Sequence, residues 1–538
     1  AAEKILKGDV KGLVQDVSLQ LERSIGLVGV IIIALSAMLG SGLFVLPSLA
    51  AGMMGTGIWL AYVMAATVVL PGALSKSELA SAMPTSGGSY VYIERTYGPL
   101  FGTIAGLGLW ASFLLKAAFA LIGLSAYLLV LSIYFEFDFN LKLVSLGILA
   151  IILLINIMGV KKIKTIQAPI VGLAVLLLLA LSIRGFFMPT LDLGGPLESA
   201  FSTDPLTLAE TAAFVFVAYA GVTKVAAIAE EVKNPGKNLP TGIIISLITA
   251  TILYAGVTYI MMATLEGEWW IVDGKTIENP IHVFAETLAG SVVGLIAAIL
   301  AIFTMASMAL AGVLGASRYI FAMARDNLLP QALEEVNAKW ETPHWPILIT
   351  GLMMALTILF LPVKDVAKLA SGFQIMIFIF VNSCVIILRK IKKGHEWYEP
   401  TYKSPLFPLT QIWGIVGGAG LLIVMGEKAF IGALAAVILG TTLYYFYGRI
   451  HTNSRTTPFQ TFRKEFVNPS QSEHERRELA FHASDLGGKN HLTLREFQSA
   501  IHALKFSYTD KECRDIFHHA DTDENGVIDI DEFLDHFE

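Results

Sequence analysis

The sequence predicts an all-α protein with about twelve transmembrane helices, followed by a small α-helical domain outside the membrane. The first observation is the composition: 55% of the 538 residues are apolar and 15% are charged, whereas soluble domains average about 45–50% and about 25%. The second is a series of apolar runs long enough to cross a bilayer. The third is an abrupt change to polar sequence at Arg449. Together they exclude a single large soluble domain.

The apolar runs define the predicted transmembrane helices in chain order. They lie at 25–50, 56–80, 98–131, 142–158, 166–188, 208–229, 241–264, 288–312, 346–362, 368–388, 409–425 and 428–448. We assign residues 1–448 to a transmembrane domain, 449–471 to a linker and 472–538 to a cytosolic domain. Lys and Arg, including Lys76 and Arg389, are concentrated on the segments that face the cytoplasm if the N-terminus does. The positive-inside rule then predicts a multi-pass plasma-membrane protein with both termini in the cytoplasm.

Two of the predicted helices are interrupted by small residues. The first contains Gly40, Ser41 and Gly42 within SAMLGSGLFVLP, and the sixth contains Ala218 and Ala220 within FVFVAYAGVTK. Glycine weakens a helix interior, and paired interruptions in corresponding helices indicate an inverted-repeat transporter with a site at the midplane. Broken ends offer amides to an anion and carbonyls to a cation, the two charged groups of an amino acid. The alternative interpretation is that small residues only let helices pack closely.

Four longer motifs carry a family resemblance. SAMLGSGLFVLP, SELASAMPTSGGSYVYIERTYGP, FVAYAGVTKVAAIAEEVKNPGKNLP and ASRYIFAMARDNLLP resemble the amino acid–polyamine–organocation family of transporters, over roughly residues 20–448. The resemblance implies two inverted five-helix repeats plus two helices, with the first and sixth helices broken. It also implies alternating access around an amino acid that lies between these two helices.

The resemblance also implies a set of substrate-binding residues. They are Met38, Gly40, Ser41, Gly42, Phe216, Val217, Ala218 and Ala220. The amides of Ser41 and Gly42 would bind the substrate carboxylate, and the carbonyls of Ala218 and Ala220 would bind its amino group. Where the family often has an aromatic gate, this chain has Val217. Because this pocket contains no fixed countercharge, we expect a neutral, apolar amino acid as substrate. A cationic amino acid or polyamine carrier, and an amino acid sensor without sustained flux, are the alternatives.

Lys116, in the middle of the third predicted helix, is a candidate for ion coupling. A central lysine is costly in a bilayer and should face a cavity or a partner. Coupling to H⁺ or Na⁺ is one interpretation, and snorkelling or bonding to carbonyls of a broken helix is the other. The lysine that some proton-coupled relatives carry in the fifth helix is absent here. Thr304 and Ser307 of the eighth helix could offer hydroxyls to Na⁺.

The last loop, DTDENGVIDIDE, matches every position of an EF-hand calcium loop. The predicted ligands are Asp521, Asp523, Asn525, the carbonyl of Val527, Asp529 and Glu532. Gly526 stands at the turn position, and the apolar Ile528 suits strand pairing with a second hand. Oxygen ligands at this spacing favour Ca²⁺. We therefore predict one competent calcium site.

The stretch DLGGKNHLTLRE, about 36 residues upstream, predicts a degenerate partner hand. Asp485 and Glu496 occupy its first and twelfth positions, but Gly487 and Lys489 replace ligands, so we expect this hand to be structural. Sensor hands expose an apolar groove on binding calcium, and Phe497, Ile501, Leu504, Phe517, Phe533 and Phe537 are candidates for such a groove or for an ordinary core. The hypothesis is that calcium switches docking of this domain on the basic cytoplasmic loops. A constitutive structural calcium site is the alternative.

Composition and motifs also exclude other classes of function. The net charge of −6 gives no indication of nucleic-acid binding. No nucleophile–base set or transition-metal cluster indicates an enzyme. The expected partners are an amino acid, a coupling ion and the lipid bilayer.

Overall fold

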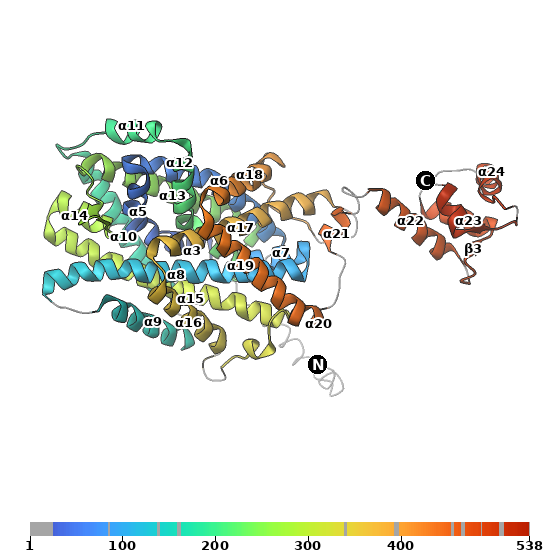
Figure 1. The fold of residues 1–538 in the computed structure, drawn as a ribbon, viewed down its shortest axis with the longest axis horizontal. Coiled ribbons are helices and arrows are strands. Elements are labelled where there is room, and N and C mark those ends of the chain that lie inside the picture. Colours follow the sequence, from blue (N-terminus) through green and yellow to red (C-terminus); the bar gives the residue numbers. More distant parts are fainter. Residues whose placement is uncertain are drawn as a thin grey trace. The chain divides into compact units, whose positions relative to one another are not determined.

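The computed structural model describes residues 25–83, 87–136, 140–158, 163–337, 340, 342–391, 398–452, 457–463, 469–485, 487–504, 510–523 and 525–536. The chain forms two compact units, Ala1–Arg455 and Thr456–Glu538. The first unit is a helical bundle, and the second is a small helical domain with one short sheet (Figure 1).

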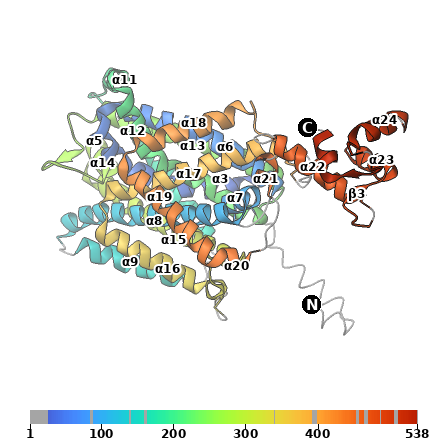
Figure 2. The ribbon, with the colours of Figure 1, turned by 45° about the vertical axis from the view of Figure 1, so that its right-hand side comes forward.

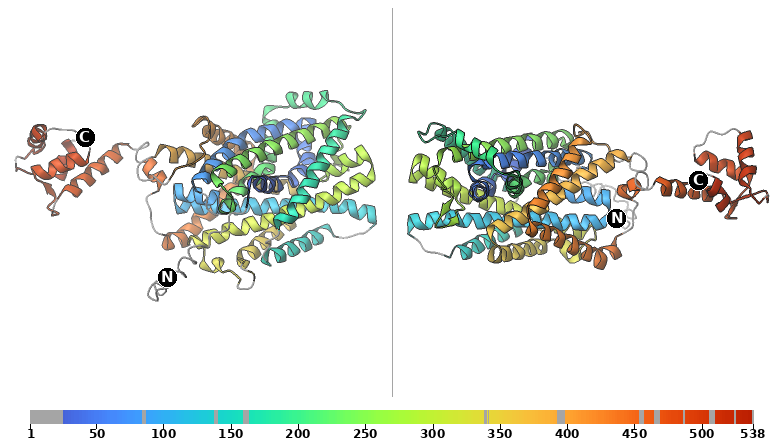
Figure 3. Two further views of the ribbon diagram at one scale, coloured as in Figure 1. Left: turned by 180° about the vertical axis from the view of Figure 1, so that it is seen from behind. Right: turned by 45° about the horizontal axis from the view of Figure 1, so that its top comes forward.

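The first half of the bundle contains a broken first helix followed by long helices. Its elements are α3 (Leu27–Met38), α4 (Ser41–Phe44), α5 (Leu46–Met54), the 3₁₀ turn η1 (Gly55–Gly57), α6 (Ile58–Ala82), α7 (Ser89–Tyr97), α8 (Pro99–Phe135), α9 (Leu141–Ile157), α10 (Ile163–Phe186) and α11 (Gly194–Ser202). The views in Figure 3 show the broken first helix, in dark blue, among the other helices.

The second half begins with the sixth transmembrane helix. Its elements are α12 (Pro205–Val215), the 3₁₀ segment η2 (Phe216–Glu231), α13 (Pro235–Thr264), the hairpin β1 (Ile271–Val272) and β2 (Lys275–Thr276), α14 (Pro280–Ala289), α15 (Ser291–Arg325), η3 (Gln331–Glu334), α16 (His344–Phe360), α17 (Val363–Lys390), α18 (Leu409–Val424), α19 (Glu427–Leu443), the π-helical turn η4 (Tyr444–Gly448) and α20 (Arg449–His451). The hairpin and α14 lie between α13 and α15.

The transmembrane prediction is confirmed for the part of the chain that the structure describes. Nine helical stretches are long and apolar enough to cross a membrane, and three shorter apolar helices, α9, α16 and α18, complete the predicted series. Figure 2 shows α9 and α16 side by side, and they pack against each other. Many large apolar side chains on the outer helices are exposed, as a lipid-facing surface requires.

Small residues bring the central helices close together. The helix α8 packs against α15 and α17. Gly312 of α15 lies against Ala117 of α8, where a Cβ on the glycine would come within 2.6 Å of the alanine Cβ. Small residues at such crossings allow the close contact that drives helix association in a bilayer.

The second unit consists of two helix–loop–helix hands. Its elements are α21 (Pro458–Phe462), α22 (Pro469–Ser484), β3 (His491–Leu492), α23 (Leu494–Ala503), α24 (Asp510–Ala520), β4 (Ile528–Asp529) and α25 (Ile530–His536). The two loops pair as antiparallel strands, with Leu492 opposite Ile528. This confirms the strand pairing expected at these two apolar positions.

Candidate functional site

The first transmembrane helix breaks at the predicted glycine. The helix α3 ends at Met38, α4 begins at Ser41, and the amide of Gly40 donates to the Met38 carbonyl at 2.9 Å. Met308 of α15 lies directly against Gly40, leaving no room for a Cβ there. The first amides of α4, from Ser41 and Gly42, have no acceptor within their helix. The break thus leaves the amides of Ser41 and Gly42 without a partner in α4.

The sixth transmembrane helix changes from α to 3₁₀ geometry at Phe216, and η2 continues for 16 residues. Runs of 3₁₀ helix longer than three or four residues are uncommon and mark strained or functional segments. Ser371 of α17 bridges the change, because its hydroxyl accepts from the Val217 amide and donates to the Phe214 carbonyl, both at 3.0 Å.

Glycine allows the two breaks to touch. A Cβ on Gly221 would lie within 2.6 Å of the Met38 amide nitrogen and 2.5 Å of the Ala37 oxygen. Both are backbone atoms, so they could not move aside as a flexible side chain would. A Cβ on Gly42 would likewise lie 3.0 Å from the Cβ of Ala218. The structure therefore brings the predicted segments of the first and sixth helices together.

Buried tyrosines bond to carbonyls near the breaks. Tyr254 donates to the carbonyls of Met38, at 2.7 Å, and Ala218, at 3.2 Å. Tyr62 donates to Gly42 at 2.9 Å, and Tyr127 donates to Phe44 at 2.6 Å. In a bilayer such carbonyls have no water to bond with. Sequence reasoning missed these tyrosines, because they come from other helices, which only tertiary packing brings to the breaks.

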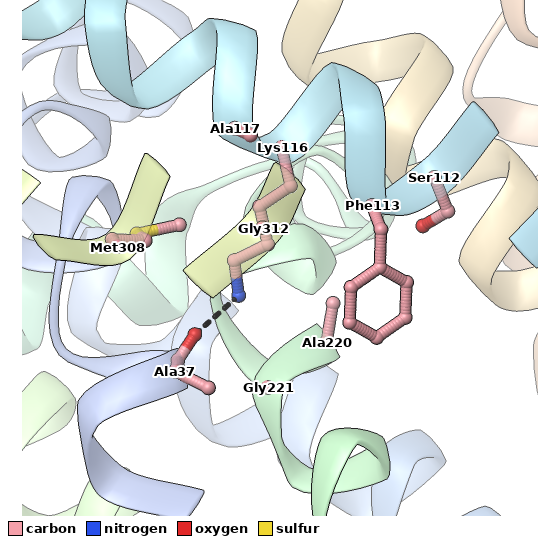
Figure 4. Close-up of a pocket in the computed structure, with 9 residues that line it drawn as sticks. All are labelled: Ala37, Ser112, Phe113, Lys116, Ala117, Ala220, Gly221, Met308 and Gly312. Atoms are coloured by element: carbon pink, nitrogen blue, oxygen red, sulfur yellow. Dashed lines mark hydrogen bonds between the residues drawn. The ribbon is translucent and has the colours of Figure 1, made fainter. Parts of the chain in front are cut away.

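Lys116 joins the two breaks. Its ammonium donates to the Ala37 carbonyl at 2.9 Å, the bond drawn in Figure 4, and to the Ala218 carbonyl at 3.3 Å. The side chain comes from α8 and is buried. One of the two sequence interpretations, bonding to carbonyls of a broken helix, is therefore the geometry that the structure has. The Ala218 carbonyl, expected to bind a substrate amino group, already has two donors.

A small cavity of about 20 Å³ lies beside Lys116. It is lined by Ala37, Ser112, Phe113, Lys116, Ala117, Ala220, Gly221, Met308 and Gly312 (Figure 4). This volume is far below that of small-molecule sites, about 300–1,000 Å³, so in this structure the two breaks are closed on each other without room for an amino acid. Lys116 alone carries charge among these described residues. The cavity is thus apolar with one cationic group.

The predicted substrate residues differ in where they lie relative to this cavity. Ala220 lines it, whereas Met38, Gly40, Ser41, Gly42 and Ala218 are buried in the contact of the two breaks. Phe216 instead packs edge-to-face against Phe378 of α17. Val217 is buried, with its amide bonded to Ser371.

The predicted sodium ligands of α15 are placed apart from the cavity lining. The Thr304 hydroxyl donates to the Leu300 carbonyl of its own helix at 2.7 Å, and the Ser307 carbonyl accepts from Gln167 at 3.2 Å. Met308 and Gly312, one and two turns after Thr304 on the same face, line the cavity. Neither was predicted, although the four-residue spacing from Thr304 is a signal for this face.

The second hand of the tail folds around its acidic residues. Carboxylate oxygens of Asp521, Asp523 and Glu532 lie within 4.8 Å of one another. Gly526 has φ of +83°, the left-handed conformation of the sixth loop position. Its amide donates to Asp521 at 2.9 Å, and the Asn525 amide donates to both Asp521 and Asp523 at 3.0 Å. This oxygen-rich donor set fits Ca²⁺.

Hydrogen bonds hold Glu532 across the loop. Burial acts to raise the pKa of its carboxyl, but the Thr522 hydroxyl and the amides of Asp529, Thr522 and Asp523 outweigh burial and lower that pKa. The Thr522 hydroxyl donates to Glu532 Oε1 at 2.8 Å. Asp529 in turn accepts from the Glu532 amide at 2.9 Å. The twelfth-position carboxylate is therefore ionised and oriented at neutral pH.

The first hand contains a lysine in place of a ligand. Lys489 Nζ lies 3.4 Å from Oε1 of Glu496, the twelfth-position carboxylate. Hydrogen bonds from the Thr493 amide and hydroxyl lower the pKa of Glu496 to about 2, and Lys489 adds to this effect. Asp485 accepts from the amides of Lys489 and Asn490. The loop of the first hand is thus held by interactions among its own residues.

The apolar residues of the tail form a core. The predicted groove candidates Phe497, Ile501, Leu504, Phe517 and Phe533 are all buried together. The ordinary-core interpretation therefore holds for these five in this structure. Phe537 lies outside the described residues.

Comparison with known proteins covers both units. The profile described as "Amino acid permease" matches residues 25–450, and the profile of the EF-hand domain pair matches residues 476–538. The chain is 29% identical over 458 residues to the branched-chain amino acid permease BcaP of Bacillus subtilis, covering 80% of this chain and 94% of the relative. It is 27% identical over 439 residues to BcaP of Lactococcus lactis (77% and 92%). It is 25% identical over 453 residues to the methylthioribose transporter of Bacillus subtilis (81% and 96%).

Proposed function

The chain belongs to the amino acid permease family, and from this premise we propose that it transports neutral, apolar amino acids by alternating access. The observation that carries the proposal is the cavity beside the two breaks, which is lined by apolar groups and one ammonium. Apolar walls suit an aliphatic side chain. The free amides of Ser41 and Gly42 suit the substrate carboxylate.

The charge of the cavity argues against the alternative substrates. Lys116 faces it, and no acid is among its described lining residues. A cationic amino acid or a polyamine would bring a second positive charge next to this ammonium in a medium of low dielectric, which is unfavourable. The two similar permeases named for branched-chain amino acids support leucine, isoleucine and valine within the neutral class.

Ion coupling is proposed to act through Lys116. Its ammonium holds the Ala37 and Ala218 carbonyls, so a substrate amino group or Na⁺ arriving there competes with it for the same oxygens. A proton leaving Lys116 would weaken its bonds to both carbonyls, since a neutral amine is a poorer donor than an ammonium. Thr304 and Ser307 stay candidates for a Na⁺ site in another state of the cycle. Both H⁺ and Na⁺ therefore remain in the proposal, and ion replacement distinguishes them.

The tail is proposed to regulate transport through calcium. Asp521, Asp523, Asn525, the Val527 carbonyl, Asp529 and Glu532 would hold the ion. With both termini in the cytoplasm, as the distribution of Lys and Arg indicates, the tail would respond to cytosolic calcium by changing how it docks on basic cytoplasmic loops such as the one that follows α17. A permanently loaded structural site is the competing proposal.

Competition for uptake tests the substrate class. Purified protein in liposomes is given labelled leucine together with an excess of unlabelled isoleucine, valine, lysine or putrescine. We expect isoleucine and valine to suppress uptake and lysine and putrescine to leave it unchanged. Suppression by lysine or putrescine would contradict the proposed class. Leucine binding without accumulation would indicate a sensor.

A further inference from the structure

Lys76 is a buried lysine of α6, a helix that packs against η2 of the sixth transmembrane helix. The sequence counts it among the cations of segments that face the cytoplasm, and the structure shows that its side chain is fully buried. Within the described residues its ammonium nitrogen has no hydrogen-bond partner. The group it contacts is the ring of Phe378, whose centroid lies 4.3 Å away.

A glycine of α6 makes room for this ring. Gly72 precedes Lys76 by four residues and therefore lies on the same face of α6. A Cβ on Gly72 would come within 2.8 Å of Phe378 Cγ and closer still to other ring atoms. Phe378 in turn meets Phe216 edge-to-face, with centroids 5.5 Å apart at 86°. The ring thus connects Lys76 with the residue at which the sixth helix changes geometry.

The nearest carboxylate along α6 is already occupied. Glu78 is buried and accepts from Arg389 Nε at 2.6 Å and from Tyr398 at 2.8 Å. It also accepts from the amide and the hydroxyl of Ser404, both at 2.8 Å. Its oxygens therefore have a full set of donors without Lys76.

The charged groups on the neighbouring elements give Lys76 no described counterion. At this end of the bundle they are Arg389 and Lys390 on α17, Glu94 and Arg95 on α7, and Lys237 on α13; α18 has none. Glu210 of α12 lies beyond the Phe216 break, in the other half of the sixth helix. The side chains of Lys224, Glu230 and Glu231 on η2 lie outside the described residues.

We propose that Lys76 is a proton-binding site of the gate formed by Phe216 and Phe378. A buried ammonium with only a ring face beside it loses more hydration free energy than the ring returns. The amine is therefore neutral while the rings pack over it. When they separate, water reaches it and it takes one proton from that water, R–NH₂ + H⁺ giving R–NH₃⁺. Closing returns the proton to the same side of the membrane.

This inference rests on the proposed function and orientation, which place this end of the bundle in the cytoplasm. Opening that binds one proton becomes about tenfold more favourable for each unit of falling pH. Acid on the cytoplasmic side therefore favours the open gate. The proton does not cross the membrane, so this site tunes release of substrate without driving it.

Leucine exchange at equal concentrations on both sides tests the proposal. The external pH is fixed, the internal pH is set at 6, 7 or 8, and wild type is compared with Lys76→Met. The control Lys237→Met removes an exposed lysine of the same end. We expect exchange by wild type and by Lys237→Met to rise severalfold from pH 8 to 6, and exchange by Lys76→Met to stay constant.

An unchanged pH slope in Lys76→Met would overturn the assignment. Absent exchange in wild type would count against transport itself, which separates the two failures. If Lys76→Met does not fold, Lys76→Arg is the second test, because arginine keeps its charge. We expect that variant to be less thermostable and insensitive to internal pH; wild-type stability with a wild-type slope would contradict the proposal.

Discussion

The ammonium of Lys116 lies at the contact between the first and sixth transmembrane helices. Its bonds to Ala37 and Ala218 satisfy carbonyls released by the breaks. Removing the ammonium leaves the Ala37 carbonyl without this donor, whereas Ala218 keeps Tyr254. The residue therefore has a structural role beside its proposed role in transport, and its substitution separates the two.

Substitution of Lys116 by Met is expected to lower leucine uptake at least tenfold. A hydrogen bond from a charged donor contributes about 1.5–3 kcal/mol, and the same change should remove the dependence on the coupling ion. Initial uptake rates with and without Na⁺, and at several external pH values, measure both effects. Lys142→Met, at an exposed position, is the control. Ion dependence that survives in Lys116→Met would refute coupling through this residue.

Glu278 lies in the loop between β2 and α14, outside the spanning helices. Burial raises the pKa of its carboxyl to about 7, against an opposing effect of Lys364. The adjoining Ile277 carbonyl accepts from Ser48 of α5 at 2.6 Å. The loop is therefore fixed to the segment that follows the first break.

This raised pKa predicts a pH-dependent stability. Between the ordinary carboxyl pKa and about 7, the folded state holds a proton that the unfolded state has lost, so stability falls as pH rises through this window. Thermal unfolding in detergent between pH 5 and 8 should show the decline in wild type and a flatter profile in Glu278→Gln. The exposed Glu268→Gln is the control and should follow wild type. Identical profiles for all three would contradict the role of Glu278.

At the scale of elements, the interrupted helices were predictable and their partners were not. Gly40 and the small residues after Phe216 are local signals, because a weak helix interior is visible in the sequence. Tyr254, Met308 and Phe378 come from other helices, and only tertiary packing turns them toward the breaks. The burial of Lys76 was not predictable for the same reason, because only the packing of neighbouring helices covers this position near a helix end.

Because the two breaks are in contact, we expect one methyl group added between them to have a large effect on uptake and stability. Gly221→Ala would push a Cβ into the backbone of Ala37 and Met38, so we expect uptake to fall to background and thermal stability to decrease. Gly256→Ala in α13 is the matched control, since nothing lies within 4 Å of the added Cβ. Helix propensity predicts that it stabilises by up to about 1 kcal/mol. Normal uptake by Gly221→Ala would show that the breaks need not approach so closely.

The paired hands predict the calcium stoichiometry of the tail. Lys489 lies at Glu496 in the first hand, so titration calorimetry of the full chain should give one calcium ion per chain. Replacing Gly487 and Lys489 together by Asp restores two carboxylate ligands, and a second ion is then expected. A stoichiometry of two in wild type would contradict the structural role of the first hand.

At the scale of the whole molecule, the chain joins a permease bundle to an EF-hand pair. The sequence predicted both, because hydropathy reveals spanning helices and the calcium loop has a fixed spacing. The sequence could not predict the proposed effect of calcium on transport. That effect depends on how the tail docks, and local sequence patterns carry no information on docking. The burial of Phe497, Phe517 and Phe533 in the tail's own core means that any apolar groove requires a change in the angle between its helices.

Leucine uptake into liposomes at controlled calcium tests whether the tail regulates transport. The tail faces the calcium-buffered solution, and uptake is measured with calcium and with chelator. Two variants are compared with wild type. Glu532→Gln lacks the twelfth-position carboxylate, and Asp535→Asn loses an exposed charge outside the loop. We predict leucine accumulation that responds to calcium in wild type and Asp535→Asn and does not respond in Glu532→Gln. Accumulation that is the same with calcium and chelator in every variant would contradict calcium regulation, and absence of accumulation would contradict transport.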